Sequence, residues 1–424
     1  MDFRVTTLRT AIINMLACAV CALLPAAADA KPKNELSVAA GVDSAYDDNV
    51  FNGRGPDWVN RVSPHASWRL IDPRLEVDAS YDLGFWTYAF GKASNSVNHR
   101  AILAVEGKPT RRLTMKVSDE FVRAEDPGYL TRIAVVAPQI GIFDNVAEGT
   151  IGFAFTKRFY GDVDYVWHHT QFDPYSQQQQ MAGMPPLYDG DEHDFQAAAA
   201  YRVLRTDDVR FGGRAQLFTA GPQAVSSWKW TQAASYSPSV GWRHQFLPQL
   251  EATLDGGPVF YQRLAGADHI PGSPDSGVTW RLAARLRWFT PTWRGTASYT
   301  HDLLGATGIG SAAWADYAYA QLGYHFLERL DVHAGGGYFR NGVAVAQTFS
   351  YDGFTVDALV DWRVIDNLRI GAYYTLRWQR TGPGAIPPGA PMAQFPDVTR
   401  DIVGIRLLAV VGADARPPRR EVKE

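Results

Sequence analysis

Histidine and acidic side chains are the first groups whose type and spacing suggest chemistry. His168 and His169 are adjacent, so on a strand their rings point to opposite faces and cannot bind one metal ion. The run 191–194 (Asp-Glu-His-Asp) offers oxygen ligands that suit Ca²⁺, but it is also typical of a solvated strand end, which we favour. No motif joins serine, histidine and acidic residues, and no glycine-rich phosphate loop is present. We therefore expect neither an enzyme nor a bound metal or cofactor.

Arginine is the second chemical signature, because it recurs on one face of several alternating segments. Arg281, Arg285 and Arg287 share such a face. The same holds for four further arginines, namely Arg210, Arg214, Arg369 and Arg377. Guanidinium groups bind carboxylates and sulfates through two hydrogen bonds, so these residues predict a track for an anionic substrate. The alternative is a lattice of ion pairs with acidic residues of the same face, such as Asp255 and Asp361.

The elements that must position these side chains are strands. From Glu35 onward, apolar and polar residues alternate with a period of two, and turn residues separate one window from the next. The clearest windows are 75–85, 278–288, 354–364 and 368–378. Each has one apolar face and one polar, mostly charged face. Each is about ten residues long or a little longer, the length that a tilted strand needs to cross a bilayer.

Short and long connections alternate between these windows. Short turns are expected at 72–73, 108–110, 159–161, 206–207, 247–248, 290–291, 327–328 and 365–366. Longer segments rich in Gly, Pro and Asn are expected at 48–57, 89–96, 124–139, 174–191, 220–229, 266–276, 305–311, 341–350 and 381–396. This rhythm predicts an all-β fold, an antiparallel transmembrane β-barrel of about eighteen strands (16–18), with short periplasmic turns and long extracellular loops.

Aromatic residues lie beside the short turns, where a membrane barrel has an interfacial girdle. They are Trp68, Phe159, Tyr160, Phe246, Trp288, Phe289, Trp293, Phe326 and Trp362. In a soluble β-sandwich or propeller the same residues would belong to the core, but such folds need no alternation of loop lengths. The content of 13 Trp, 19 Tyr, 21 Phe and 38 Gly in 424 residues also favours strands and turns over a helical bundle.

The first thirty residues have the features of an export signal. Arg4 and Arg9 precede an apolar stretch at 11–24, and Ala28-Asp29-Ala30 supplies a small-residue cleavage site. An imperfect lipobox ending at Cys18 leaves lipidation as an alternative. We expect a signal peptide over 1–30, an outer-membrane barrel over 31–412 and a periplasmic tail over 413–424, in a Gram-negative bacterium.

Cysteine and charge counts narrow the range of partners. Cys18 and Cys21 are the two cysteines of the chain and both precede the cleavage site, which excludes disulfides and thiolate metal sites from the mature protein. The formal net charge of −3 gives no reason to expect a nucleic-acid partner. Beyond the N-terminus no run of about 18 apolar residues occurs, so no transmembrane helix is expected. Outer-membrane lipid is therefore the first expected partner.

Two terminal motifs carry a family resemblance. The stretch Tyr46-Asp47-Asp48-Asn49-Val50, the later Ser63-Pro64 and the closing segment 398–406 resemble the porin-2 type of outer-membrane β-barrel. Members of this group often occur with exopolysaccharide synthesis and export systems, so the resemblance implies a polysaccharide-export porin. Barrels of this type usually end on an aromatic residue, whereas here the tail 413–424 follows. That tail is either a disordered extension or a docking segment for a periplasmic export protein.

Three functional classes remain open from the sequence. The first is a conduit for a secreted exopolysaccharide, the second a general or solute-specific diffusion porin, and the third a non-conducting surface barrel for adhesion or anchoring. A polymer conduit must not leak, so we expect its longest loops to fold over the mouth as gates. The residues assigned to these gates are Tyr175, Gln178, Pro186 and Pro388.

Overall fold

The computed structural model describes residues 32–50, 55–125, 140–173, 188–222, 231–265, 276–306, 311–326, 329–343, 350–382 and 397–412. Its strands are β1 (Lys33–Asp47), β2 (Asp57–Ile71), β3 (Leu75–Tyr88), β4 (Ser96–Gly107), β5 (Leu113–Ala124), β6 (Ile142–Ala154), β7 (Phe159–Phe172), β8 (Tyr188–Arg202), β9 (Asp207–Pro222), β10 (Thr231–Leu247), β11 (Leu250–Ala265), β12 (Ser276–Phe289), β13 (Trp293–Ala306), β14 (Ser311–Phe326), β15 (Leu330–Val343), β16 (Ser350–Ile365), β17 (Leu368–Gly382) and β18 (Val398–Gly412). None of the described residues forms a helix long and apolar enough to cross a membrane.

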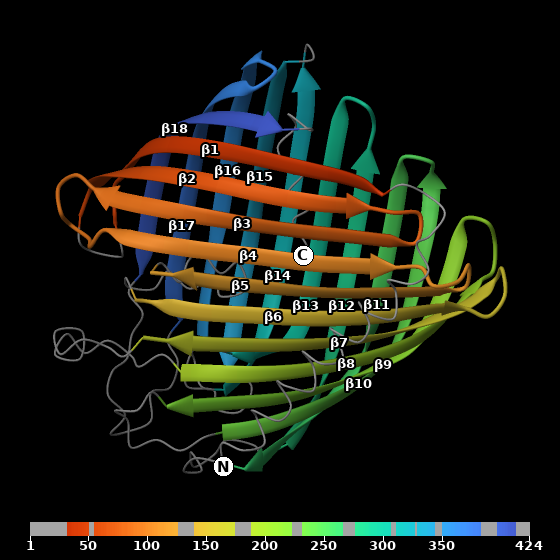
Figure 1. Ribbon diagram of the computed structural model, residues 1–424. Coiled ribbons are helices and arrows are strands. Elements are labelled where there is room, and N and C mark those ends of the chain that lie inside the picture. The colour runs from red at the N-terminus through yellow and green to blue at the C-terminus, as the bar shows by residue number, and fades with distance from the viewer. Residues whose placement is uncertain are drawn as a thin grey trace, which may run out of the picture.

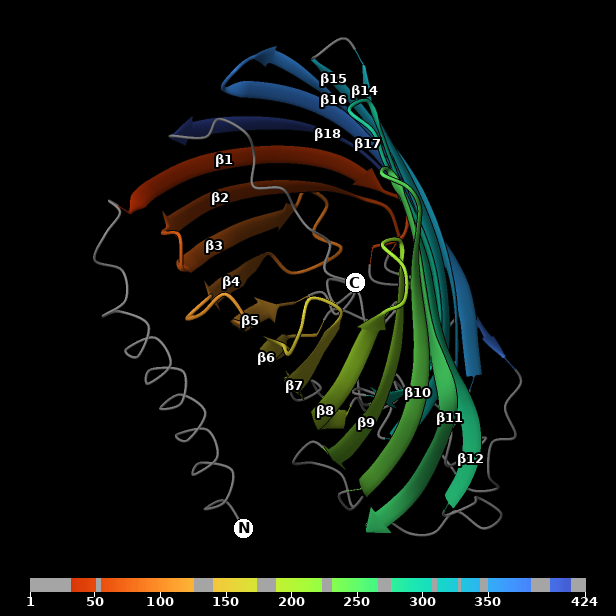
Figure 2. The same ribbon diagram turned by 90° about the vertical axis from the view of Figure 1, so that its right-hand side faces the viewer.

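The strands form one closed antiparallel barrel (Figures 1 and 2). Each strand pairs with its sequence neighbours, and β1 pairs with both β2 and β18, which closes the sheet. The expected architecture and the count of eighteen strands are confirmed. Closure leaves the sheet without an edge strand, as a barrel in a lipid environment requires.

The alternating sequence places apolar side chains on the outside of the barrel. On β12, Val278 and Trp280 are 66% and 49% exposed, whereas Arg281 on the opposite face has only 13% of its side chain exposed. The same outward face carries exposed Phe354 on β16 and Ile370 on β17. Strands of 12 to 17 residues exceed the length needed to span the hydrocarbon. The outer surface is therefore suited to lipid and the inner surface to water.

The short turns and both described chain ends lie at one end of the barrel. Lys33 pairs with Ile71 just before the 72–74 turn, and Ser37 pairs with Gly412 at the end of β18. Trp68, Phe246, Trp288 and Trp362 are exposed on the outer face at this end, as an aromatic girdle requires. The other end carries the long connections and is called the loop end below.

Two sequence-based boundaries are wrong. The turn expected at 159–161 lies at 155–158, because the Thr156 hydroxyl accepts hydrogen bonds from the backbone N–H groups of Arg158 (3.2 Å) and Phe159 (2.9 Å). Tyr160 therefore belongs to the inner face of β7, where it contacts Asp208, and not to the girdle. The loop expected at 174–191 ends earlier, because β8 begins at Tyr188.

The pairing of β10 with β11 is interrupted where two prolines face each other. Pro238 of β10 lies opposite Pro258 of β11, and the ladder between the two strands lacks the pairs between Tyr236↔Phe260 and Val240↔Gly256. Proline has no backbone N–H, so ladder bonds are lost at this point. The residue before Pro258, Gly257, lies so close to the carbonyl group of Pro238 that a Cβ there would collide with it.

Candidate functional site: a lumen with two unlike walls and a narrowed mouth

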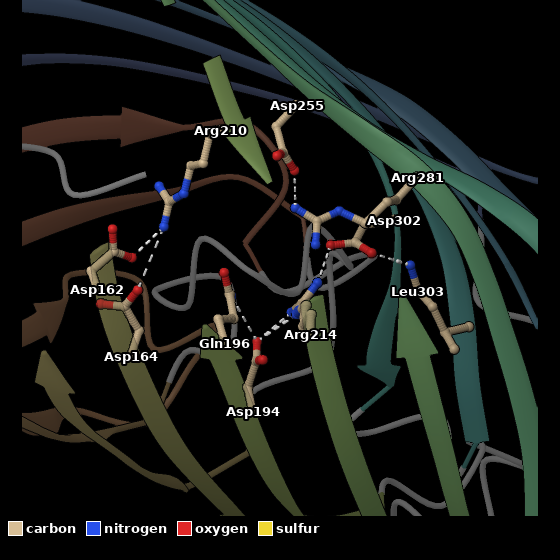
Figure 3. Close-up of polar contacts among 10 residues, drawn as sticks. All are labelled: Asp162, Asp164, Asp194, Gln196, Arg210, Arg214, Asp255, Arg281, Asp302 and Leu303. Carbon is tan, nitrogen blue, oxygen red and sulfur yellow. Dashed lines mark hydrogen bonds and ion pairs between the residues drawn. The ribbon is translucent and has the colours of Figure 1, made fainter. Parts of the chain in front are cut away.

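Arg210 of β9 and Arg281 of β12 point into the lumen and meet carboxylates. Arg210 pairs closely with Asp162 and lies 4.0 Å from Asp164, and Arg281 pairs closely with Asp255 (Figure 3). On β17, Arg369 lies 3.8 Å from Asp331. With Arg214, described next, at least four of the seven predicted arginines have an acidic partner.

The three remaining predicted arginines differ in position. Arg285 and Arg377 are half-buried on the inner face, and Arg287 is exposed beside the short turn that follows β12. The structure thus distributes the predicted set over β9, β12 and β17. The ion-pair lattice accounts for Arg210, Arg214, Arg281 and Arg369, and the anionic track stays a prediction.

Arg214 is the most enclosed cation of the set. Its side chain is 10% exposed and binds Asp194 of β8 (2.5 Å) and Asp302 of β13, whose side chains are 7% and 13% exposed (Figure 3). Charges withdrawn from water are stable only when paired and hydrogen-bonded, and one guanidinium with two carboxylates meets this condition. Because β10, β11 and β12 separate β9 from β13 along the wall, the pair Arg214–Asp302 crosses the interior.

An apolar contact accompanies this ion pair. Leu303 of β13 is fully buried and packs with Phe218 of β9, Ala233 of β10 and Val259 of β11. Those three residues lie on the inner face of their strands near the loop end. The last residues of β13 have therefore left the wall and occupy the mouth of the lumen, which they narrow.

A row of rings follows the inward turn of β13 and β14. Trp280 stacks on His301 with ring centroids 3.8 Å apart, and Trp314 lies 5.9 Å from His301 and 5.6 Å from Tyr261. The row joins the outer face at Trp280 to the inner face at Tyr261. These rings lie where the pairing between β12 and β13 ends, at Leu282↔His301.

The opposite wall, on β13–β17, combines charged residues, among them Asp331, Asp357, Asp361 and Arg369, with a group of hydroxyl side chains. Its inward hydroxyl and amide side chains include Ser298, Thr300, Tyr317, Tyr319, Gln321, Thr355, Tyr373 and Thr375. Tyr317 and Tyr319 are nearly parallel, with centroids 6.2 Å apart and planes 7° apart, and Tyr317 is 37% exposed. A Cβ on Gly335 would lie 3.0 Å from the Tyr319 hydroxyl oxygen, so glycine leaves room for this ring against β15. We call this set the hydroxyl wall.

The remaining sequence candidates do not assemble into a site. His168 is buried on the inner face, where its Nε2 lies 2.6 Å from Asp144, while His169 contacts Asp191 on the outer face. Within the run 191–194, Glu192 and Asp194 point inward and the other two outward. Among the residues that the structure describes, no group of three or more His, Cys, Asp or Glu is placed to hold a metal ion.

The predicted gates lie outside the described residues. Tyr175, Gln178, Pro186 and Pro388 cannot be placed, and neither can the export signal or the tail 413–424. Among the described residues, the end of the β13–β14 hairpin narrows the lumen, which the sequence did not predict. One signal was available: Leu303 and Leu304 are consecutive apolar residues that break the alternation of β13.

Comparisons with known proteins give no family. No family model matches the chain, and no curated protein matches its sequence. Among solved structures, the FrpB iron transporter from Neisseria meningitidis has 10% identity and a TM-score of 0.44, covering 89% of this chain and 81% of that one. OccAB3 from Acinetobacter baumannii has 8% identity and a TM-score of 0.41, covering 90% and 99%. The siderophore receptor PirA from Pseudomonas aeruginosa has 8% identity and a TM-score of 0.42, covering 90% and 81%.

Proposed function

We propose that this barrel is an outer-membrane conduit through which a secreted exopolysaccharide leaves the cell. The observation that carries the proposal is the hydroxyl wall, with its two parallel tyrosines Tyr317 and Tyr319. Sugar hydroxyls exchange hydrogen bonds with Ser, Thr and Tyr hydroxyls, and the C–H faces of sugar rings pack on aromatic faces. A polymer passes when many contacts of this kind are each weak, because tight binding at one place would stop it.

The paired charged residues on the inner face of β7–β12, which we call the charged wall, support the same function in a different way. Arg210, Arg214 and Arg281 are neutralised by neighbouring carboxylates, so they hold a passing chain less firmly than free cations would. The resemblance to porin-2 type barrels adds support for polysaccharide as the cargo. A periplasmic export protein at the short-turn end is the partner that this function requires.

The test in cells uses the hydroxyl wall and a matched control. A strain lacking the gene should lose extracellular polysaccharide, and the wild-type gene should restore it. The double variant Tyr317→Ala and Tyr319→Ala should restore several-fold less, whereas Tyr338→Ala, an outward tyrosine that is 44% exposed, should restore it fully. Equal export by both variants would contradict the role of the wall.

A solute porin is the second candidate, and the ion-pair lattice favours it. The pairing of Arg210, Arg214, Arg281 and Arg369 with carboxylates offsets their charge in a water-filled lumen, which suits passive diffusion. This candidate predicts that the deletion strain keeps its polysaccharide and grows poorly on one small solute. That pair of results would replace the export proposal.

A further inference from the structure

The ladder between β12 and β13 stops before either strand ends. It runs from Phe289↔Arg294 to Leu282↔His301, although β12 begins at Ser276 and β13 continues to Ala306. The same end of β13 stays paired with β14 through Ala306↔Ser311. Within the described strands, the pairing of β12 with β13 therefore ends before the loop end. Beyond that point β13 stays paired with β14 and is separated from β12.

Two contacts hold that end inside the lumen. Asp302 binds Arg214 on the far wall, and Leu303 fills the apolar cluster of β9–β11. Along β13 up to His301, where its pairing with β12 ends, odd-numbered residues such as Trp293 face outward. By that periodicity Leu303 would face lipid if the strand continued straight, and Asp302 would face the lumen.

Extending the register across the open seam gives matched partners. Each step lowers the β12 number by one and raises the β13 number by one, so after Leu282↔His301 come Arg281↔Asp302, Trp280↔Leu303 and Thr279↔Leu304. The first pair is a cross-strand ion pair on the lumen face. The second is an apolar pair on the lipid face.

We propose that the loop end of β13 has two seats and that its movement gates the barrel. In the inner seat, seen here, Asp302 binds Arg214 and the mouth is narrow. In the wall seat, β13 zips onto β12, Asp302 binds Arg281, Leu303 faces lipid beside Trp280, and the mouth is wide. Asp302 thus has an arginine partner in each seat, and Arg281 is held by Asp255 while the strand is away.

The device depends on the fold and not on the cargo. An export conduit and a solute porin would both be opened by it, so the gate can fail while the proposed function stands. Loss of the export phenotype would likewise leave the gate untouched.

A cysteine pair tests the wall seat directly. With Cys18 and Cys21 replaced by Ala, the full chain offers no competing thiol to Thr279→Cys and Leu304→Cys. These positions face each other only when β13 lies on β12, within the reach of a disulfide. Adding Arg214→Gln, which breaks the inner seat, should speed disulfide formation by roughly tenfold or more.

Arg210→Gln is the matched background, because Arg210 lies on the same strand and face but its carboxylate partner, Asp162, belongs to β7. It should leave the rate of disulfide formation as in the parent. Heat-modified migration on SDS gels confirms that each variant is folded. In planar bilayers the oxidised pair should have a higher conductance than the reduced pair. Equal rates in the two arginine backgrounds, or equal conductance on oxidation, would overturn the proposal.

Discussion

The two walls of the lumen differ in the interactions that hold their inward side chains in place. On β7–β12, charged side chains reach across the strands and neutralise one another, and Arg214 even reaches β13 across the interior. On β13–β17, tyrosine rings lie against glycines of the neighbouring strand, as Tyr319 does over Gly335. Ion pairs hold the side chains of the charged wall, and removing one partner lowers stability. Close packing against glycine holds the tyrosine rings of the hydroxyl wall. Substitutions should therefore change stability on the charged wall and passage on the hydroxyl wall.

The largest expected effect is on stability at the charged wall. Arg214→Ala leaves Asp194 and Asp302 enclosed without their cation, which should lower the free energy of unfolding by about 3–5 kcal/mol. Arg210→Ala removes a more exposed pair, so its cost should stay within about 1 kcal/mol. Denaturant unfolding of the barrel in detergent measures both. Equal costs would show that the cross-lumen pair does not fix this wall.

A glycine of the hydroxyl wall should affect passage. Gly335→Val places side-chain atoms where the Tyr319 ring now lies, so the ring should turn into the lumen and lower the single-channel conductance. Gly149→Val is the control, because a Cβ there would meet nothing within 4 Å. Gly335→Val should have the lower conductance of the two variants. Both should keep heat-modified migration on SDS gels, which shows that they are folded. If Gly335→Val and the control had equal conductance, the packing of Tyr319 over Gly335 would not determine the width of the lumen.

The smallest expected effect concerns ion selectivity. Replacing Arg281, Arg285 and Arg287 together with Gln should lower anion over cation permeability, measured as a shift of the reversal potential in a salt gradient. The shift should be modest, because Asp255 already offsets Arg281. An unchanged reversal potential would assign all three arginines to the ion-pair lattice.

The fold was largely predictable because each strand carries its own signal. Period-two alternation places Val278 and Arg281 on opposite faces of β12 without any knowledge of the neighbouring strands. The narrowed mouth was not predictable in this way. Arg214 and Asp302 are 88 residues apart and lie on strands that are not neighbours, and local periodicity assigns Leu303 to the lipid face. Contacts across a lumen depend on curvature, which a single sequence does not report.

Current block by oligosaccharides tests the conduit most directly. The purified barrel is placed in a planar bilayer, and neutral oligosaccharides of increasing length are added at the short-turn side. A polysaccharide conduit should show brief, concentration-dependent interruptions of the current that lengthen with the number of sugars and weaken when Tyr317 and Tyr319 are both replaced by Ala. An open current that no oligosaccharide interrupts would contradict this function.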